Sequence, residues 1–259
     1  MLNIDQDRID GVGREAMGCG DRLIAVVGLA FEARIVAGPG VRVICSGNGK
    51  DLAASLSRAI AEGATGVMSF GVAGGLSPSL PPGTCIIGSG ILFGSDRINR
   101  INTDHDWSQK LLQTIPGAVR GLLFGVHEPV THPRAKAALF KRTGAIAVDM
   151  ESHVVGGVAA AHGIPMAAVR VIADPAARAI PASALAAMRP NGTTDVAAMI
   201  WSMLKRPADF PAVVRTALDA RAARATLMRG RQLLEPGLGI PFARREAENS
   251  SNLPIPLPA

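Results

Sequence analysis

Aromatic and cysteine side chains are scarce in this sequence. Aromatic residues make up only 3% of the 259 residues and tyrosine is absent, so surfaces that bind nucleic acid through interleaved aromatic and basic side chains are nearly excluded. We therefore expect no nucleic-acid partner. The three cysteines, Cys19, Cys45 and Cys85, are odd in number and show no CxxC spacing. This favours a reduced, cytoplasmic setting over a disulfide framework.

Long apolar runs and metal-ligand patterns are also missing. No apolar run approaches the roughly 18 residues that a membrane span needs. Residues 1–20 are polar and have no apolar centre of the kind found in signal peptides, so we expect a loose N-terminal arm on a cytoplasmic protein. The histidines are scattered without a carboxylate or cysteine companion at metal-ligand spacing, so we predict no metal site and no bound cofactor. They are His105, His127, His132, His153 and His162.

Apolar residues are abundant, at 48% of the chain, and they form short runs separated by glycine-rich turns. The runs at 23–29, 41–45 and 66–70 read as buried strands, and helical patterns follow in repeated alternation. Such alternation is typical of a mainly parallel sheet covered on both faces. We predict an α/β fold: one three-layer α/β/α domain over residues 21–210, with a central mixed, mainly parallel sheet.

The most informative stretch runs from Ala145 to Asp174. It reads as a short strand, an acidic turn with Glu151, a helix over about 152–162 and a second strand that ends at Asp174. Side chains alternate along a strand, so Arg170 and Asp174 should share one face. Open α/β sheets bind ligands at the carboxyl ends of their strands. The pattern predicts either a ligand site or, equally, a helix cap with an ion pair that closes the sheet edge.

The C-terminal region carries much of the net charge of +6. Residues 211–234 are predicted to form a basic amphipathic helix, a helical appendage to the domain, and residues 235–259 a disordered tail. One side of this helix would be apolar, with Val214, Leu218 and Met228. Two interpretations stay open: peripheral contact with an anionic membrane such as the inner membrane, or a helix packed on the domain.

Two glycine-rich turns follow predicted strands, at Ser46–Lys50 and Gly71–Gly75. The first has neither the length of a phosphate-binding P-loop nor the GxGxxG of a dinucleotide site. Each turn alone is explained by the backbone conformations that glycine permits. Two such turns at neighbouring strand ends favour a shared floor for a ligand.

The chain resembles the superfamily of purine nucleoside phosphorylases and methylthioadenosine/S-adenosylhomocysteine nucleosidases. Ser46-Gly-Asn-Gly-Lys50 is similar to the family's SGIGK turn, and Gly71-Val-Ala-Gly-Gly75 to its GSAGG turn. Val148-Asp-Met-Glu151 is similar to its VEMEA segment, and Arg170-Val-Ile-Ala-Asp174 to its RxxSD strand end. In addition, Gly28–Arg34 and the arginine-rich helix after Pro207 resemble bacterial hopanoid-associated phosphorylases, which are associated with removing adenine from adenosylhopane.

The resemblance implies a role for each matching residue in breaking an N-glycosidic bond. Asp174 would protonate N7 of the departing purine, and general acids of this kind contribute roughly 10²–10⁴-fold. Glu151 and the Met150 backbone would hold the ribose hydroxyls. Arg170 would orient the carboxylates or the attacking group, and Glu32 would position a water molecule.

The remaining implied contacts are less sharply defined. Those on the phosphate or water side are Ser46, Gly47, Lys50, Gly71 and Val72, and those to the base are Glu128 and Pro129. Inorganic phosphate is the implied co-substrate, the partner is a small nucleoside that carries a triterpenoid tail, and a homo-oligomer is expected.

Several departures from the family pattern keep alternatives open. Val72 replaces a Ser or Thr that commonly contacts the attacking group, and Ala173 replaces the Ser beside the catalytic acid. Ser69 stands where phosphorylases carry an anion-binding arginine. The prediction is adenine release from adenosylhopane by phosphorolysis. The alternatives are a hydrolytic methylthioadenosine/adenosylhomocysteine nucleosidase and a catalytically poor nucleoside-binding protein.

Overall fold

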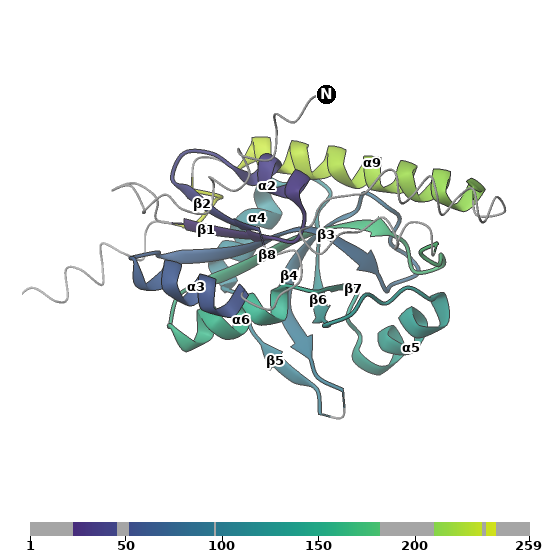
Figure 1. Cartoon of the computed structure of the whole chain (residues 1–259), viewed down its shortest axis with the longest axis horizontal. Coiled ribbons are helices and arrows are strands. Elements are labelled where there is room, and N and C mark those ends of the chain that lie inside the picture. The colour runs from purple at the N-terminus through teal and green to yellow at the C-terminus, as the bar shows by residue number, and fades with distance from the viewer. Residues whose placement is uncertain (1–22, 46–51, 96, 182–209, 235–236, 242–259) are drawn as a thin grey trace, which may run out of the picture.

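The computed structural model describes residues 23–45, 52–95, 97–181, 210–234 and 237–241, and these ranges contain one eight-stranded sheet and six helices (Figure 1). The predicted N-terminal arm over residues 1–20 lies outside the described residues. So do the turn at 46–51 and most of the predicted C-terminal tail.

Most strands follow the apolar runs of the sequence, but Gly71–Gly75, predicted as a turn, is part of a strand. They are β1 (Leu23–Val27), β2 (Val41–Cys45), β3 (Gly66–Gly75), β4 (Cys85–Phe93), β5 (Asn99–Ile101), β6 (Val119–Gly125), β7 (Ala147–Asp149) and β8 (Met166–Asp174). Their order is β2-β1-β3-β7-β6-β4-β5, and β8 pairs with both β3 and β4. The pairs β3–β7, β7–β6, β6–β4, β4–β8 and β8–β3 therefore close into a ring, and β1 and β2 extend the sheet from β3.

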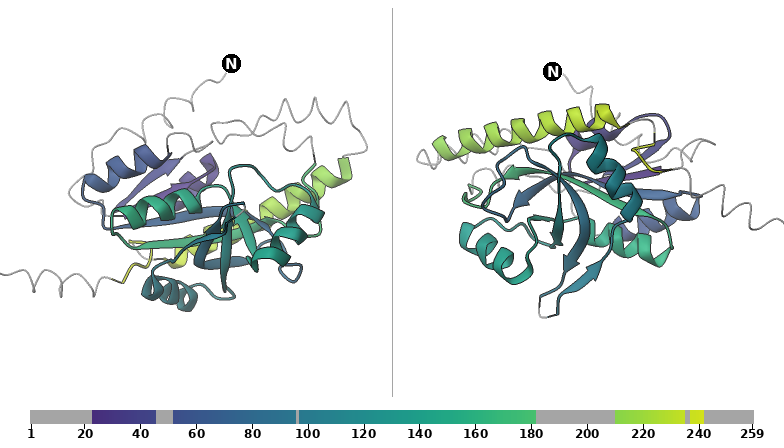
Figure 2. Two further views of the ribbon diagram at one scale, coloured as in Figure 1. Left: turned by 90° about the horizontal axis from the view of Figure 1, so that it is seen from below. Right: turned by 180° about the vertical axis from the view of Figure 1, so that it is seen from behind.

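Helices cover both faces of this sheet (Figure 2). α3 (Leu52–Ala61) and α6 (Ser152–Ala161) pack together on one face. α2 (Ala30–Val36), α4 (His105–Thr114) and α9 (Phe210–Leu233) cover the other face, while α5 (Pro133–Thr143) follows β6. Five of the eight strand pairs are parallel and three are antiparallel. The predicted three-layer α/β/α fold with a mixed, mainly parallel sheet is confirmed.

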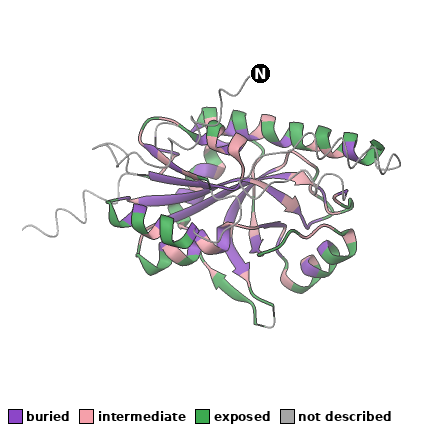
Figure 3. Ribbon diagram, viewed as in Figure 1, coloured by how far each residue is buried: buried purple, intermediate pink, exposed green. Residues whose placement is uncertain are grey.

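Strand alternation builds two apolar cores, one on each face of the sheet. In β1, Leu23, Ala25 and Val27 enter the core under α4 and α9, whereas Ile24 and Val26 enter the core under α3 and α6. All five are buried, because a central strand covered on both faces has no side open to water. The strands lie as a buried layer between helices whose outer sides are exposed (Figure 3).

α9 begins and ends close to its predicted bounds, but the predicted apolar side is not the side that packs on the domain. Val213 and Leu227 are buried against the core, whereas Val214, Leu218 and Met228 are exposed. The difference arises because one helix carries apolar residues on two sides, and helical periodicity alone cannot say which side meets the sheet.

The chain just beyond α9 also belongs to the core. Leu238 is fully buried, and its carbonyl accepts a hydrogen bond of 2.9 Å from the indole nitrogen of Trp107. Arg231 fixes the end of α9 by donating to the carbonyls of Val36 at 3.0 Å and Leu234 at 2.9 Å. Residues 237–241 of the predicted disordered tail are therefore packed against the domain. No helix within the described ranges is both long enough and apolar enough to cross a membrane.

Candidate functional site

The segment from β7 to β8 folds as a strand, a turn, a helix and a strand. β7 ends at Asp149, α6 starts at Ser152, and β8 runs to Asp174. Asp149 accepts the backbone N–H of Ser152 at 3.3 Å and also the Ser152 hydroxyl. It thereby satisfies one of the free N–H groups that open every helix. This contact places Asp149 and Glu151, at the head of α6, beside β8.

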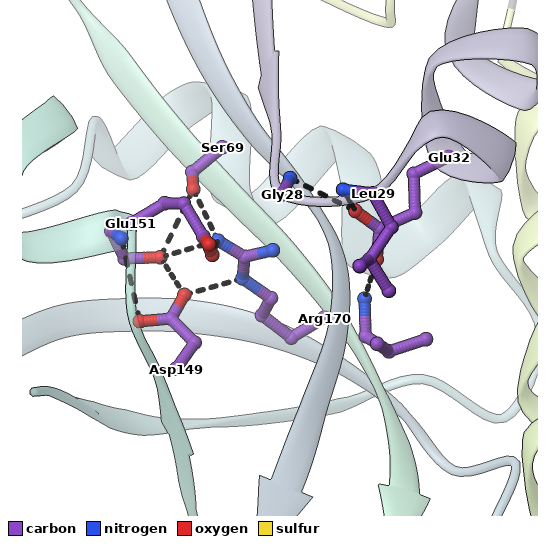
Figure 4. A network of polar contacts seen from close by, with 9 residues as sticks. Gly28, Leu29, Glu32, Ser69, Asp149, Glu151 and Arg170 are labelled. Atoms are coloured by element: carbon purple, nitrogen blue, oxygen red, sulfur yellow. Dashed lines mark hydrogen bonds and ion pairs between the residues drawn. The ribbon is translucent and has the colours of Figure 1, made fainter. Parts of the chain in front are cut away.

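Arg170 is the centre of a buried polar network (Figure 4). Its side chain is 1% exposed. The guanidinium Nε lies 2.5 Å from Asp149 Oδ2, and Nη2 lies 3.2 Å from Glu151 Oε2. Nη2 also donates to the hydroxyls of Ser69 at 2.7 Å and Ser152 at 3.3 Å. Contacts from β3, β7 and the start of α6 thus fix this planar cation of β8.

Glu32 of α2 approaches the same network from the other side. Its carboxylate accepts three backbone N–H groups: Gly28 at 3.0 Å, Leu29 at 2.9 Å and Val72 at 2.7 Å. These bonds join the β1–α2 turn to β3 (Figure 4). Glu32 is 1% exposed, so the three donors supply the hydrogen bonds that water would otherwise provide.

Two glycines permit this close packing. A Cβ at Gly71 would lie 2.5 Å from Glu32 Oε1 and 2.7 Å from Arg170 Nη1, and a Cβ at Gly28 would lie 2.6 Å from Glu151 Oε1. Any side chain at these positions would displace a charged group. Glycine at both positions therefore leaves room for the ends of charged side chains from neighbouring elements.

The network holds more carboxyl groups than cations. Three carboxylates, those of Asp149, Glu151 and Glu32, act on the single guanidinium of Arg170. Burial raises the pKa of Glu151 to about 7; Arg170 opposes this, and Asp149 and Glu32 add to it. Burial likewise raises the pKa of Glu32 against the effect of Arg170. Burial acts to lower the pKa of Arg170, but the surrounding carboxylates raise it overall.

Asp174 belongs to a second polar group at the same end of the sheet. Its carboxylate forms an ion pair with Lys136 of α5, which is fully buried. Lys136 Nζ also donates to the carbonyls of Pro175 at 3.1 Å and Arg178 at 3.2 Å. Burial raises the pKa of Asp174 and the Lys136 ammonium opposes that shift.

The expectation that Arg170 and Asp174 lie side by side is wrong, because the strand is irregular near its end. Ala73 of β3 pairs with Ile172, but the next residue, Gly74, pairs with Asp174. The pairing skips Ala173, so strict alternation does not reach Asp174. Arg170 contacts Asp149 and Glu151 instead, and Lys136 is the cation beside Asp174.

β7 connects the two polar groups. A Cβ at Gly74 would lie 3.2 Å from Val148 of β7 and 3.3 Å from both carboxylate oxygens of Asp174. Asp149, the next residue of β7, holds Arg170. The predicted acid Asp174 and the predicted ribose contact Glu151 therefore flank the same short strand, at the carboxyl ends of β3 and β8.

Only part of the predicted phosphate or water side is described. Gly71 and Val72 lie against Glu32, as given above, whereas Ser46, Gly47 and Lys50 lie outside the described residues. Met150 connects Asp149 with Glu151 and is half-buried.

A cavity of about 740 Å³ lies beside the predicted base-binding segment. It is largely apolar, and its lining includes Phe93, Phe124, Val130, Ala138, His127 and His153. Glu128 and Pro129 are exposed and do not line it. His153 and His127 meet edge to face with centroids 4.8 Å apart, and burial lowers the pKa of His153.

Sequence reasoning missed Lys136, and it assigned no contact to Ser69 or Ser152. Lys136 lies in a helix with exposed Arg134, Lys141 and Arg142, so it looks like one more residue of a solvated face. The one available signal was position, since Lys136 lies in the same i, i+3 row as Leu139, which is also buried.

Residues 24–205 match the Phosphorylase superfamily, and comparison with curated protein sequences gives no match. The chain belongs to the Phosphorylase superfamily. This membership confirms the prediction of an enzyme of the nucleoside phosphorylase and nucleosidase class that cleaves N-glycosidic bonds.

Several solved structures are similar over most of their length. The 5′-methylthioadenosine/S-adenosylhomocysteine nucleosidase of Campylobacter jejuni has a TM-score of 0.55 at 15% identity, covering 81% of this chain and 100% of that one. A mutant of the corresponding Helicobacter pylori nucleosidase, with 5′-methylthioadenosine in its active site, has a TM-score of 0.55 at 16% identity. The match covers 83% of this chain and 98% of the nucleosidase chain. A futalosine hydrolase mutant of Helicobacter pylori has a TM-score of 0.55 at 15% sequence identity. The match covers 81% of this chain and 97% of the hydrolase chain. At these identities the likeness shows the fold.

Proposed function

We propose that the protein releases adenine from an adenine nucleoside, with adenosylhopane as substrate and inorganic phosphate as the attacking group. One observation carries the proposal: Asp174 and Glu151 flank β7, with Arg170 fixed beside Glu151. One carboxyl group can then serve the purine while the other accepts the ribose hydroxyls. Cleavage builds positive charge on the ribose, and the nearby carboxylates Glu151 and Glu32 would stabilise it.

The proposed roles keep the assignments that the family resemblance suggests. Asp174 protonates the purine, Glu151 with the Met150 backbone holds the ribose, and Arg170 orients Glu151. Support for a large apolar substituent comes from the cavity beside α6, whose lining is largely apolar. A triterpenoid tail needs such a surface, because burying its carbon skeleton is the main favourable term available for binding it.

Hydrolysis is a second candidate, and the charge balance favours it. Three carboxylates face one guanidinium among the described residues of the network, and such a site repels a phosphate dianion. Glu32 accepts three N–H groups and keeps its carboxylate beside Gly71, a suitable place to orient a water molecule. This is the hydrolytic methylthioadenosine/adenosylhomocysteine nucleosidase reaction.

An adenine-release assay separates the candidates. Adenosylhopane and methylthioadenosine are each incubated with the protein, with and without phosphate, and free adenine is measured. Phosphate-dependent release from adenosylhopane supports the proposal, and phosphate-independent turnover of methylthioadenosine supports the nucleosidase. Binding of both nucleosides without release of adenine would leave a catalytically poor nucleoside-binding protein.

A variant that fills the cavity tests the substrate's tail. Ala138 lines the cavity from α5 and is exposed, so Ala138→Phe narrows the space without entering the core. We expect it to raise KM for adenosylhopane about tenfold or more, since several buried CH₂ groups are each worth about 0.8 kcal/mol. KM for methylthioadenosine should be unchanged. Ala137→Phe, exposed on the same helix outside the cavity lining, is the matched control.

We further propose peripheral contact with an anionic membrane through α9, and a homo-oligomeric assembly. Phe210, Val214 and Leu218 recur every fourth residue, so they share one side of the helix, and each is exposed. Arg215 and Arg221 are exposed on the same helix. Such a helix side binds anionic lipid through apolar burial and charge. Val214→Asp with Leu218→Asp should abolish sedimentation with anionic vesicles, and unchanged sedimentation would refute the contact.

A further inference from the structure

Lys136 is a buried lysine whose position is fixed by three acceptors. Its side chain is 0% exposed. Nζ contacts the Asp174 carboxylate and donates to the carbonyls of Pro175 and Arg178 at 3.1 and 3.2 Å. An ammonium group has three N–H donors, and here each has one acceptor. This arrangement places the Lys136 amine directly against Asp174, the residue proposed to protonate the departing purine.

The ion pair with Lys136 determines whether Asp174 carries a proton that it can donate. In an ion pair the carboxylate is ionised and the proton resides on the lysine, so Asp174 alone has no proton to donate. Protonation of the purine needs one. The only fully buried ammonium in contact with Asp174 among the described residues is that of Lys136.

We propose that Lys136 is the proton source for the departing base and that Asp174 transfers its proton. The inference rests on the proposed N-glycosidic cleavage and deepens it. Lys136 does not touch the substrate in this scheme, so it is a positioning residue and proton reservoir that acts through Asp174.

A proton moves from Lys136 Nζ to the Asp174 carboxylate, which gives a neutral amine and a carboxylic acid. The acid donates this proton to a ring nitrogen of the purine as the C1′–N bond breaks, and the bonding electron pair stays with the purine. The base leaves neutral and Asp174 is again a carboxylate. Water or phosphate forms the new bond to C1′, and the proton lost by attacking water, or one from solvent, restores the ammonium.

The geometry satisfies both states of the pair. As an ammonium, Lys136 donates to Asp174, Pro175 and Arg178. As a neutral amine it keeps two N–H donors for the two carbonyls, and its lone pair accepts the O–H of the Asp174 acid. Burial disfavours charge on both partners. The charged and neutral forms of the pair can therefore interconvert without leaving a polar atom unpaired.

The pH dependence of kcat for adenine release tests the direction of this proton flow. In Lys136→Met only Asp174 can carry the proton, and the Asp174 carboxyl group loses this proton at its own pKa. We expect the alkaline limb of the profile to move to lower pH, with kcat about 100-fold below wild type near pH 8. The control is Lys141→Met, an exposed lysine on the same helix, which should match wild type.

Two other outcomes would overturn the inference. If Lys136 only held down the pKa of Asp174, its removal would move the alkaline limb to higher pH. If it only supported the loop after β8, kcat would fall equally at all pH values. A substrate with a good leaving group, 4-nitrophenyl β-D-ribofuranoside, adds a second readout: its cleavage needs no protonation and should be nearly unaffected in Lys136→Met.

A readout independent of turnover separates this inference from the proposed function. The ¹³C carboxyl signal of Asp174 should report a carboxylate in the wild-type protein near pH 7. If it reports a carboxylic acid there, Asp174 carries its own proton and the inference fails even where adenine is released. If the wild-type protein cleaves no adenine nucleoside, the proposed function fails, and a carboxylate signal would still support Lys136 as the holder of the proton. The wild-type measurement also decides the case if Lys136→Met does not fold.

Discussion

Two buried cations hold carboxylates at the same end of the sheet, and they do so in opposite ways. Arg170 faces three carboxylates through a planar group that contacts β3, β7 and α6. Lys136 faces one carboxylate and two carbonyls. The Arg170 network therefore holds three carboxyl groups against one cation, whereas the Lys136–Asp174 pair holds one of each. The first arrangement suits a site that stabilises a cationic ribose, and the second suits proton transfer.

Among the substitutions that distinguish the two buried cations, removing Arg170 should have the largest effect. In Arg170→Met, three buried carboxylates lose their common partner, and breaking a buried ion pair from one side costs roughly 3–5 kcal/mol. We expect a loss of that size in the free energy of unfolding, measured by chemical denaturation. A loss below about 1 kcal/mol would show that the carboxylates are protonated or rearranged and that Arg170 does not hold the network.

Asp174→Asn should affect turnover more than stability. The amide keeps a similar shape but cannot transfer a proton, so kcat for adenine release should fall by roughly 10²–10⁴-fold. Adenine binding, measured by calorimetry, should stay within about threefold of wild type. Equal kcat in this variant would remove Asp174 from the mechanism.

The sequence allowed the order of elements and the Glu151 and Asp174 positions to be predicted, because local signals mark them. Apolar runs define β7 and β8, and Gly163 followed by Pro165 ends the helix between them. The partners of Asp174 could not be predicted in this way. The irregular pairing at Ala73 and Gly74 depends on contact between strands far apart in the chain. Lys136 reaches Asp174 only because the closed ring of strands brings α5 to the end of β8.

Glu151 should give the network a pH dependence that Asp174 does not share. Burial raises the pKa of Glu151 from 4.5 to about 7, so the folded protein retains this proton where the unfolded chain has lost it. The stability it contributes is complete below about pH 4.5 and is lost as pH rises to about 7. The free energy of unfolding of the wild-type protein should therefore fall by up to about 3 kcal/mol relative to that of Glu151→Gln across this window.

Denaturation of both proteins at several pH values measures this difference. The ionised carboxylate is the stronger acceptor for ribose hydroxyls, so wild-type KM should also fall as pH rises past about 7. A constant gap between wild type and Glu151→Gln from pH 4.5 to above 7 would contradict the raised pKa of Glu151.

A methyl group at Gly28 should disturb only the Arg170 side. The added Cβ would lie 2.6 Å from Glu151 Oε1, so the carboxylate must move. We expect Gly28→Ala to raise KM about tenfold, the order expected for weakening one charged hydrogen bond, and to change the pH dependence of kcat little. Gly157→Ala on α6 is the control, because nothing lies within 4 Å of its added Cβ. Equal KM in the two variants would mean that Glu151 does not hold the sugar.

The smallest effect should come from the ion pair that joins the Lys136 side to α9. Arg178 pairs with Asp219 of α9, but the Arg178 side chain is 44% exposed, and exposed pairs contribute about 0–1 kcal/mol. Its backbone carbonyl, which holds Lys136, is unchanged by Arg178→Met. We expect unfolding free energy within about 1 kcal/mol of wild type and an unchanged pH profile for adenine release. A shift of that profile would show that α9 acts on the Lys136–Asp174 pair through Asp219, whose charge raises the pKa of Asp174.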